Sequence, residues 1–261
     1  MELGLAGKIA LVTGSSQGIG QAIALKLAEE GAKVMLTARD HSSLESVAHK
    51  IRACGGEAKI HAADMVAPGE PERIVEAARR GFGGLDILVN SAGATKAVDF
   101  LACTADDLHA GFAVKYFAHF LLTKAAWPLL KERKGTVLAI VGIRSRTPDP
   151  DSMIATSVNS ACVGFMKALA DRGVRDGVQV NVINPGSVQT ERFKRGLLQR
   201  HMAATGLDQD AAKADIVRTY RITRLGVPED IAALASFVVS PPARWLQGSI
   251  IDMDGGITKS L

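Results

Sequence analysis

The sequence predicts a single α/β domain over residues 1–261, with a doubly wound parallel sheet between two layers of helices in a Rossmann-like arrangement. Short, continuously apolar runs recur along the chain, and amphipathic segments separate them. Strands that are apolar on both faces are typical of a parallel sheet that helices cover on both sides. A glycine-rich turn also lies between the first apolar run and the first amphipathic segment, as in dinucleotide-binding folds.

The apolar runs are the expected strands, and the segments between them are the expected helices. Ser42 with Glu45, and Thr104 with Asp107, have the spacing of a capping box ahead of an apolar stripe, which predicts two helix starts. The strands are expected at residues 9–12, 34–36, 87–89, 137–141, 180–183 and 250–251.

Three further segments are expected to be helical. Residues 106–133 predict a long helix that bends near Pro128, and residues 152–175 predict a second long helix. Between residues 191 and 224 the apolar periodicity weakens and charges multiply. We expect this part, called the lid segment below, to form helices outside the sheet that close over a pocket.

Composition excludes several classes of protein. Hydrophobic residues make up 47% of the chain and charged residues 22%, which is ordinary for a globular domain. The basic residues behind the net charge of +4 are interleaved with acidic ones, so no nucleic-acid partner is expected. Cys54, Cys103 and Cys162 lack the spacing of a zinc site, so no metal is expected. With no long apolar run or leader pattern, we expect a cytoplasmic protein without a membrane partner.

The glycine-rich turn is the clearest functional signal. Gly14, Gly18 and Gly20 follow an apolar strand and precede the amphipathic segment 22–30. Missing side chains let the backbone approach a pyrophosphate, and the helix N-terminus presents free N–H groups to it. The alternative is a turn that is glycine-rich for structural reasons alone. The expected cofactor contacts of this turn are Gly14, Ser16, Gln17, Gly18, Ile19 and Gly20.

The end of the second strand indicates which dinucleotide fits. An NAD-specific site places an acid here against the ribose diol, whereas this chain has Ala38 followed by Arg39. Arg39 has the chemistry to pair with a 2′-phosphate. The sequence therefore favours NADP(H) over NAD(H), although an exposed arginine without a ligand is the alternative.

Nearly the whole chain resembles the short-chain dehydrogenase/reductase family. Besides the glycine-rich turn, the resemblance depends on motifs that follow the third, fourth and sixth strands of the family's fold and on the closing part of the chain. These are Asp64, residues 90–93 (Asn-Ser-Ala-Gly), residues 184–186 (Asn-Pro-Gly) with Thr190, residues 224–232, Gly248 and residues 254–256.

The resemblance implies further contacts with the cofactor and a homotetramer or homodimer. Structural roles stay open for single residues, since Asn90 could lock the sheet and residues 185–186 could turn the chain. By similarity, Asp64 and Met65 border the adenine, Asn90, Ala92 and Gly93 lie on the ribose side, and Pro185, Gly186, Val188 and Thr190 lie by the nicotinamide.

The family works with an Asn, Ser, Tyr and Lys tetrad, and this chain departs from it. Matching the motifs places Lys115, Gly142, Ala155 and Asn159 at those four positions. Asn has become Lys on one helix while Lys has become Asn on the next, so we hypothesise that an ammonium has been exchanged between helices. The alternative is that Lys115 points to solvent.

The loss of the tyrosine bears most on function. A methyl group neither hydrogen-bonds a carbonyl nor supplies a proton, and positioned acid–base help is worth about 10²- to 10⁴-fold in rate. The sequence therefore favours an NADP(H)-binding protein with a sensing, partner or scaffold role over conventional carbonyl reduction. One alternative is an oxidoreductase in which Lys115 replaces the lost acid. Another is a lyase or isomerase that uses Lys115 as a base or imine-forming amine.

The loop of residues 144–152 lies where the family contacts substrate. We expect a solvated loop in which Arg144 and Arg146 form local ion pairs with the neighbouring aspartates. The alternative is that the two arginines hold a small, acidic ligand bidentately. His119 lies one helical turn after Lys115 and is expected to be structural.

Overall fold

The computed structural model describes residues 2–93 and 95–259, in which seven parallel strands form one sheet in the order β3-β2-β1-β4-β5-β6-β7. This confirms the predicted fold class. The strands are β1 (Ile9–Thr13), β2 (Lys33–Ala38), β3 (Ala58–Ala62), β4 (Ile87–Asn90), β5 (Thr136–Ile140), β6 (Gln179–Pro185) and β7 (Ile250–Met253). The α-helices are α1 (Gly18–Glu29), α2 (His41–Ala53), α3 (Glu70–Phe82), α4 (Ala105–Phe112), α5 (Ala118–Glu132), α6 (Met153–Asp176), α7 (Glu191–Phe193), α8 (Gln199–Thr205), α9 (Gln209–Tyr220) and α10 (Pro228–Val238).

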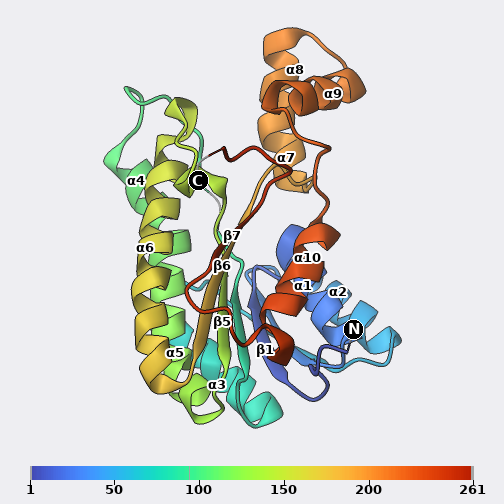
Figure 1. Ribbon diagram of the computed structural model, residues 1–261, viewed down its shortest axis with the longest axis vertical. Helices are drawn as coiled ribbons and strands as arrows, with labels where there is room; N and C mark the ends of the chain where they lie inside the picture. Colours follow the sequence, from blue (N-terminus) through green and yellow to red (C-terminus); the bar gives the residue numbers. More distant parts are fainter. Residues whose placement is uncertain (1, 94, 260–261) are drawn as a thin grey trace.

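Two helical layers cover the sheet (Figure 1). Helices α1, α2 and α10 bury one apolar cluster against one face, and α3, α5 and α6 bury a second cluster against the other. Strand β1 pairs with β2 on one side and β4 on the other, so the chain reverses direction of winding between β1 and β4. In open parallel sheets, ligands bind outside the carboxyl ends of the strands at such a switch point.

Three local features differ from the expectations. Strand β3 shows no continuous apolar run, because it is the edge strand and part of it is exposed. Asp40, and not Ser42, caps α2 by accepting a hydrogen bond from the Ser43 N–H at 2.7 Å. Helix α5 continues through Pro128, and the irregularity in the long helix is instead a π-helical turn at Ala113–Phe117 between α4 and α5. The capping box at Thr104 is confirmed.

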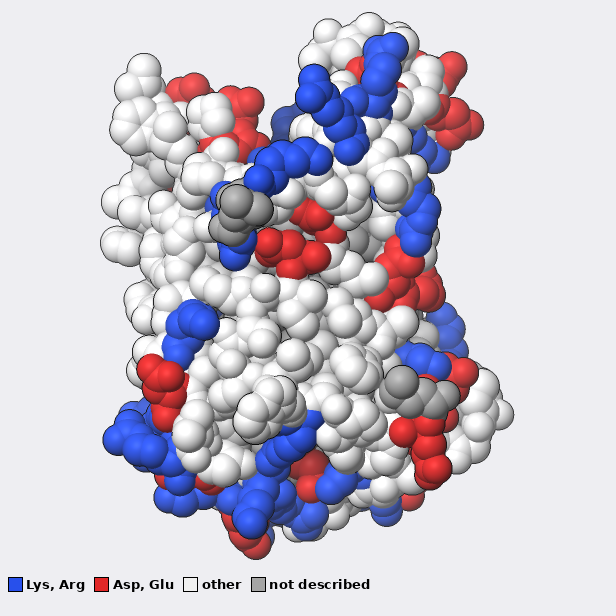
Figure 2. All heavy atoms as spheres, in the orientation of Figure 1, with Lys and Arg blue, Asp and Glu red and all other residues white. Residues whose placement is uncertain are grey.

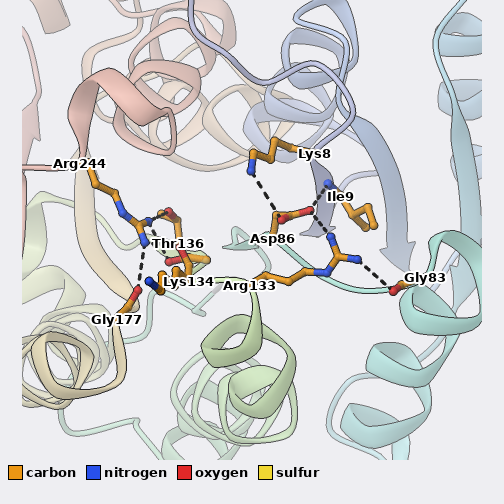
Figure 3. Close-up of polar contacts among 10 residues, drawn as sticks. Lys8, Ile9, Gly83, Asp86, Arg133, Lys134, Thr136, Gly177 and Arg244 are labelled. Carbon is orange, nitrogen blue, oxygen red and sulfur yellow. Dashed lines mark hydrogen bonds and ion pairs between the residues drawn. The ribbon is translucent and has the colours of Figure 1, made fainter.

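Ion pairs fix the amino ends of the central strands, opposite the carboxyl ends (Figure 3). Asp86, just before β4, accepts a hydrogen bond from the Ile9 backbone N–H at 2.9 Å and pairs with Arg133 at 3.5 Å and Lys8 at 3.9 Å. Arg244 joins the ends of β5 and β6 by donating to Thr136 Oγ1 and to the carbonyls of Lys134, Gly135 and Gly177. The Arg244 donors are thus used inside the fold.

Helix α6 matches its predicted position and is a core helix of its layer. The span Pro150–Asp176 comprises α6 and the short helical turn before it. By length and composition alone, this span could cross a bilayer. Its inward face, however, packs in the apolar cluster on the sheet through Val158, Cys162, Met166 and Ala170.

The lid segment is helical and lies beyond the carboxyl ends of the strands, as Figure 1 shows at the top of the view. Helix α7 leads through a π-helical turn at Lys194–Leu198 into α8 and α9. These helices form a small apolar cluster of their own, which includes Phe193, Leu198 and Ile216. This cluster is separate from the two core clusters, so the apolar side chains of the lid segment pack mainly against one another and not against the sheet.

Candidate cofactor and reaction site

The glycine-rich turn leaves the start of α1 open to an anion. Gln17 is the N-cap residue but makes no side-chain capping bond, and the first turn of α1 contains no acidic residue. Gly14 and Gly18 have φ angles of +63° and +59°, which side chains rarely tolerate. The first N–H groups of a helix lack intrahelical partners, so this end suits a pyrophosphate.

The same turn lies against the loop after β4. A Cβ atom added to Gly14 would lie 2.9 Å from Ala92 Cα, so only glycine fits. Thr13 Oγ1 accepts hydrogen bonds from the backbone N–H groups of Ser91 and Ala92, each at 2.9 Å. The two loops thus meet at the switch point.

We expect Gly20→Ala to weaken NADPH binding at least about tenfold, because the added methyl would overlap the carbonyl group of Gly14 and displace the turn from the cofactor. Fluorescence titration of NADPH measures this. Gly164→Ala is the matched control, since a methyl there meets nothing within 4 Å, and it should leave binding unchanged. Equal affinity of Gly20→Ala and the wild type would contradict the assigned site.

The residues expected beside the adenosine end lie on adjacent strand ends. Arg39 is exposed directly after β2, and Asp64 follows β3. The register pairs Ala38 with Ala62, which brings both chain segments to one edge of the site. Met65 follows Asp64 and packs partly against the second core cluster.

The base of the lid segment closes on the glycine-rich turn. Thr190 caps α7 by accepting a hydrogen bond from the Phe193 N–H at 3.2 Å, and its methyl group lies 3.3 Å from the Cβ position of Gly18. Between them lies a cavity of about 200 Å³, lined by residues of α1, α10 and the chain around Thr190. The glycine-rich turn and the lid segment therefore share one site.

The chain after β6 is held firmly before it enters the lid segment. Pro185 ends β6, and Gly186 donates a backbone hydrogen bond to the Met253 carbonyl at 3.1 Å. Val188 is buried and bridges to Gly226. Gly186 thus continues the pairing of β6 with β7 at the carboxyl edge of the sheet.

Asn90 ties β4 to the helix layer. Its Nδ2 donates to Thr123 Oγ1 at 2.9 Å, while its Oδ1 is buried without a partner in the described residues. The structural role considered for Asn90 is therefore real. The unpartnered oxygen also leaves an acceptor at the end of β4, next to the expected ribose side.

Lys115 lies buried in the π-helical turn, so the interpretation that it points to solvent is wrong. The residue is 7% exposed. Its ammonium donates to the Val141 carbonyl at 2.5 Å and to Asn159 Oδ1 at 2.8 Å. Lys115 and Asn159, the two residues that the exchange hypothesis relates, are thus in direct contact. Burial lowers the pKa of Lys115 to about 8.

Two of the ionisable groups beside Lys115, His119 and Cys162, are neutral near pH 7. Burial, aided by the charge of Lys115, lowers the pKa of His119 to about 4. Burial raises the pKa of Cys162 to about 11. The His119 ring nitrogen Nε2 lies 2.8 Å from the Ala92 carbonyl, which agrees with its expected structural role.

Gly142 and Ala155, which the resemblance matches to the serine and tyrosine of the family, carry no side-chain hydroxyl. Gly142 follows β5 with a φ of +132°. Its N–H donates to Asn184 Oδ1 at 3.2 Å, and its carbonyl accepts from Asn159 Nδ2 at 3.4 Å. Ala155 lies in the first turn of α6. Ser145, the nearest serine in the chain after Gly142, donates to the Gly142 carbonyl at 3.1 Å.

The loop arginines are paired with carboxylates. Arg144 lies 2.5 Å from Asp149, and Arg146 lies 3.4 Å from Asp252. The expected local ion pair is found for Arg144, whereas the partner of Arg146 lies on β7, outside the loop. Sequence reasoning missed Arg192, which reaches from α7 to the Gly93 carbonyl at 3.1 Å. Only the tertiary approach of the lid segment reveals that contact.

The chain matches known proteins over almost its full length. The family model described as enoyl-(acyl carrier protein) reductase matches residues 14–258. An uncharacterized oxidoreductase of Mycobacterium tuberculosis is 34% identical over 253 residues, which cover 96% of this chain and 92% of the relative. The NADPH-dependent reductase BacG of Bacillus subtilis is 30% identical, over 97% of this chain and 99% of the relative.

Solved structures give the same result. L-Sorbose reductase from Gluconobacter frateurii, in complex with NADPH and L-sorbose, superposes with a TM-score of 0.95. It is 30% identical, and the match covers all of both chains. NADPH is named for this structure and for BacG, in agreement with the cofactor that the end of the second strand predicts.

Proposed function

Since the chain belongs to the short-chain dehydrogenase/reductase family, we propose that it is an NADP(H)-dependent oxidoreductase in which Lys115 replaces the tyrosine as acid and base. The buried ammonium of Lys115, held by Val141 and Asn159, carries this proposal. Together with the oxidoreductase relatives, it favours catalysis over the binding, sensing or partner role that the sequence alone favours.

The proposed cofactor site follows the carboxyl edge of the sheet. The start of α1 holds the pyrophosphate on its free N–H groups, and Arg39 pairs with the 2′-phosphate. Asp64 and Met65 border the adenine. The ribose and nicotinamide side is assigned to Asn90, Ala92, Gly93, Pro185, Gly186, Val188 and Thr190.

Lys115 is placed to serve the nicotinamide end of this site. Its Cγ lies 2.9 Å from the Cβ position of Gly93, so the lysine stem fills the space beside that glycine. A π-helical turn often marks a functional position in a helix, and Lys115 lies at the middle of Ala113–Phe117. An ammonium with a pKa of about 8 is acidic enough to protonate an alkoxide.

The proposed step balances as a carbonyl reduction. NADPH, when bound, would supply a hydride (a hydrogen with its electron pair) to the carbonyl carbon and would leave as NADP⁺. The C=O π bond opens, and the oxygen takes one proton from the Lys115 ammonium to give the alcohol. Lys115 is left as a neutral amine and regains a proton from solvent; oxidation of the alcohol runs through the same groups in reverse.

A binding role is the second candidate, because Gly142 and Ala155 bring no hydroxyl to the substrate carbonyl. The test combines NADPH titration with a panel of ketones, aldehydes and alcohols. Our proposal expects NADPH binding and turnover of at least one substrate class. Binding without turnover would support the sensing role, and a lysine adduct trapped by borohydride with a carbonyl compound would support the lyase or isomerase route.

The pH dependence follows from the lowered pKa of Lys115. Below about pH 8 the group is an ammonium and can donate, and above it the donating fraction falls about tenfold for each pH unit. We expect kcat/KM for reduction to fall above about pH 8, and kcat/KM for oxidation to rise through the same point. The pKa of His119 is about 4 and that of Cys162 is about 11, so neither group accounts for a change in kcat/KM near pH 8. A reduction profile that stays flat across about pH 7 to 9 would exclude Lys115 as the proton donor.

We also propose a homo-oligomer, a dimer or tetramer, in the cytoplasm. Phe117, Phe120 and Leu121 expose 50%, 39% and 41% of their surface around the start of α5. The Phe120 ring lies 4.8 Å, centroid to centroid, from Phe165 on α6. Exposed apolar patches of this kind mark interaction surfaces, and sedimentation measures the assembly.

A further inference from the structure

Arg192 reaches across the mouth of the proposed reaction site. It lies on α7, and its guanidinium donates from Nη1 to the Gly93 carbonyl at 3.1 Å and from Nη2 to the Thr95 carbonyl at 3.5 Å. The Lys115 side chain lies beside Gly93 as well, since its Cγ is 2.9 Å from the Cβ position of that glycine. Two cationic side chains from different parts of the chain therefore meet at one glycine.

This meeting place carries positive charge that no described carboxylate neutralises. Among the ion pairs of residues 2–93 and 95–259, none involves Lys115 or Arg192. Glu191, which precedes Arg192, pairs instead with Lys194 at 2.7 Å. The two charges also repel each other, and this repulsion contributes to the lowered pKa of Lys115.

The lid side of the site adds positive charge, and a notch gives a ligand room to enter. Figure 2 shows this notch at the upper end of the molecule, with Lys and Arg side chains on the lid side and Asp and Glu side chains on the α4 side. From Glu191 to Arg195 the lid segment has three basic side chains, Arg192, Lys194 and Arg195, against the single acidic residue Glu191. A cleft with excess charge of one sign attracts ligands of the opposite sign.

We propose that the substrate is an oxo acid, a carbonyl compound whose carboxylate binds Arg192 while its carbonyl oxygen faces Lys115. This inference rests on the proposed oxidoreductase function. Arg192 donates to the two backbone carbonyls from Nη1 and Nη2, and a guanidinium fork offers such a pair of nitrogens to the two oxygens of one carboxylate. A charged carboxylate binds such a fork more strongly than two neutral carbonyls do, so it displaces them.

Substrate charge and the guanidinium are varied together in the test. Oxo acids and their methyl esters are compared as substrates for the wild type, Arg192→Gln and the control Arg200→Gln. We expect the wild type to prefer acids, and Arg192→Gln to raise KM for acids about 10- to 100-fold, the worth of charge-assisted hydrogen bonds. KM for esters should change less than about threefold, and Arg200→Gln should change neither.

A purely structural role for Arg192, as a latch between α7 and the loop after Gly93, predicts a different result. Losing a latch would weaken turnover of acids and esters equally, and that outcome would overturn the proposal. A wild type that prefers esters would overturn it as well.

Binding gives a readout that does not depend on turnover. Calorimetry in the presence of NADP⁺ compares oxamate with its uncharged amide, oxamide. We expect oxamate to bind the wild type at least about tenfold more tightly than Arg192→Gln, and oxamide to show no such difference. If the protein turned over no carbonyl compound, this selectivity would still support an anion site at Arg192, and its absence would reject that site even in an active enzyme.

Discussion

Lys115→Met is expected to lower kcat by about 10²- to 10⁴-fold, the usual worth of a positioned acid. Methionine keeps an unbranched, apolar stem beside Gly93 but donates no proton and leaves the Val141 carbonyl without its partner. NADPH affinity should change less than about tenfold, because the pyrophosphate grip lies at the start of α1. Steady-state kinetics and NADPH titration measure the two effects separately.

The control for this substitution is Lys124→Met. Lys124 lies on the same helix layer, in α5, but is exposed to solvent. It should leave kcat unchanged. If Lys115→Met retained wild-type turnover in either direction, Lys115 would have no part in the chemistry, and the proton would have to come from another group.

The second large effect is expected from Asn159→Lys. The new ammonium would lie within hydrogen-bonding distance of Lys115, since Asn159 Oδ1 and Lys115 Nζ are 2.8 Å apart. Two buried like charges repel, and an uncompensated buried charge costs about 3 to 5 kcal/mol. The free energy of unfolding, measured in urea, should fall by about that amount.

The exchanged double variant should recover most of that loss. Lys115→Asn combined with Asn159→Lys again places one ammonium and one amide in the same space, with their helices reversed. The double variant should therefore be more stable than Asn159→Lys alone, with a favourable coupling energy. Lys124→Asn in the same background should give no recovery. A double variant as unstable as Asn159→Lys would contradict the exchange of ammonium and amide between helices.

The features that the sequence predicts best are those set by local pattern. Continuous apolar runs predict β1, β2, β4, β5, β6 and β7, and the glycines at 14, 18 and 20 predict the anion-binding start of α1. Strand β3 gives no such run because its edge position leaves Lys59 exposed. Pattern reasoning therefore works where a strand has consecutive apolar side chains, and this includes β7, whose residues are only partly buried.

The features that it misses depend on tertiary placement. The direction of Lys115 follows from the π-helical turn, which places the side chain against Gly93 and has no signature in residue type. The contact between Arg192 and Gly93 joins residues 99 positions apart in the chain. The sequence predicts local ion pairs for Arg144 and Arg146, yet Arg146 pairs with Asp252, which is distant in the chain and lies on β7.

The five residues of the π-helical turn at Ala113–Phe117 face two environments at once. Lys115 is buried to 7% exposure, whereas Phe117, two positions later, is 50% exposed. A molecule that binds to the Phe117 ring therefore contacts the same π-helical turn that positions the Lys115 amine. A substitution at Phe117 that alters binding at the outer surface is therefore expected to change the position of the Lys115 amine as well.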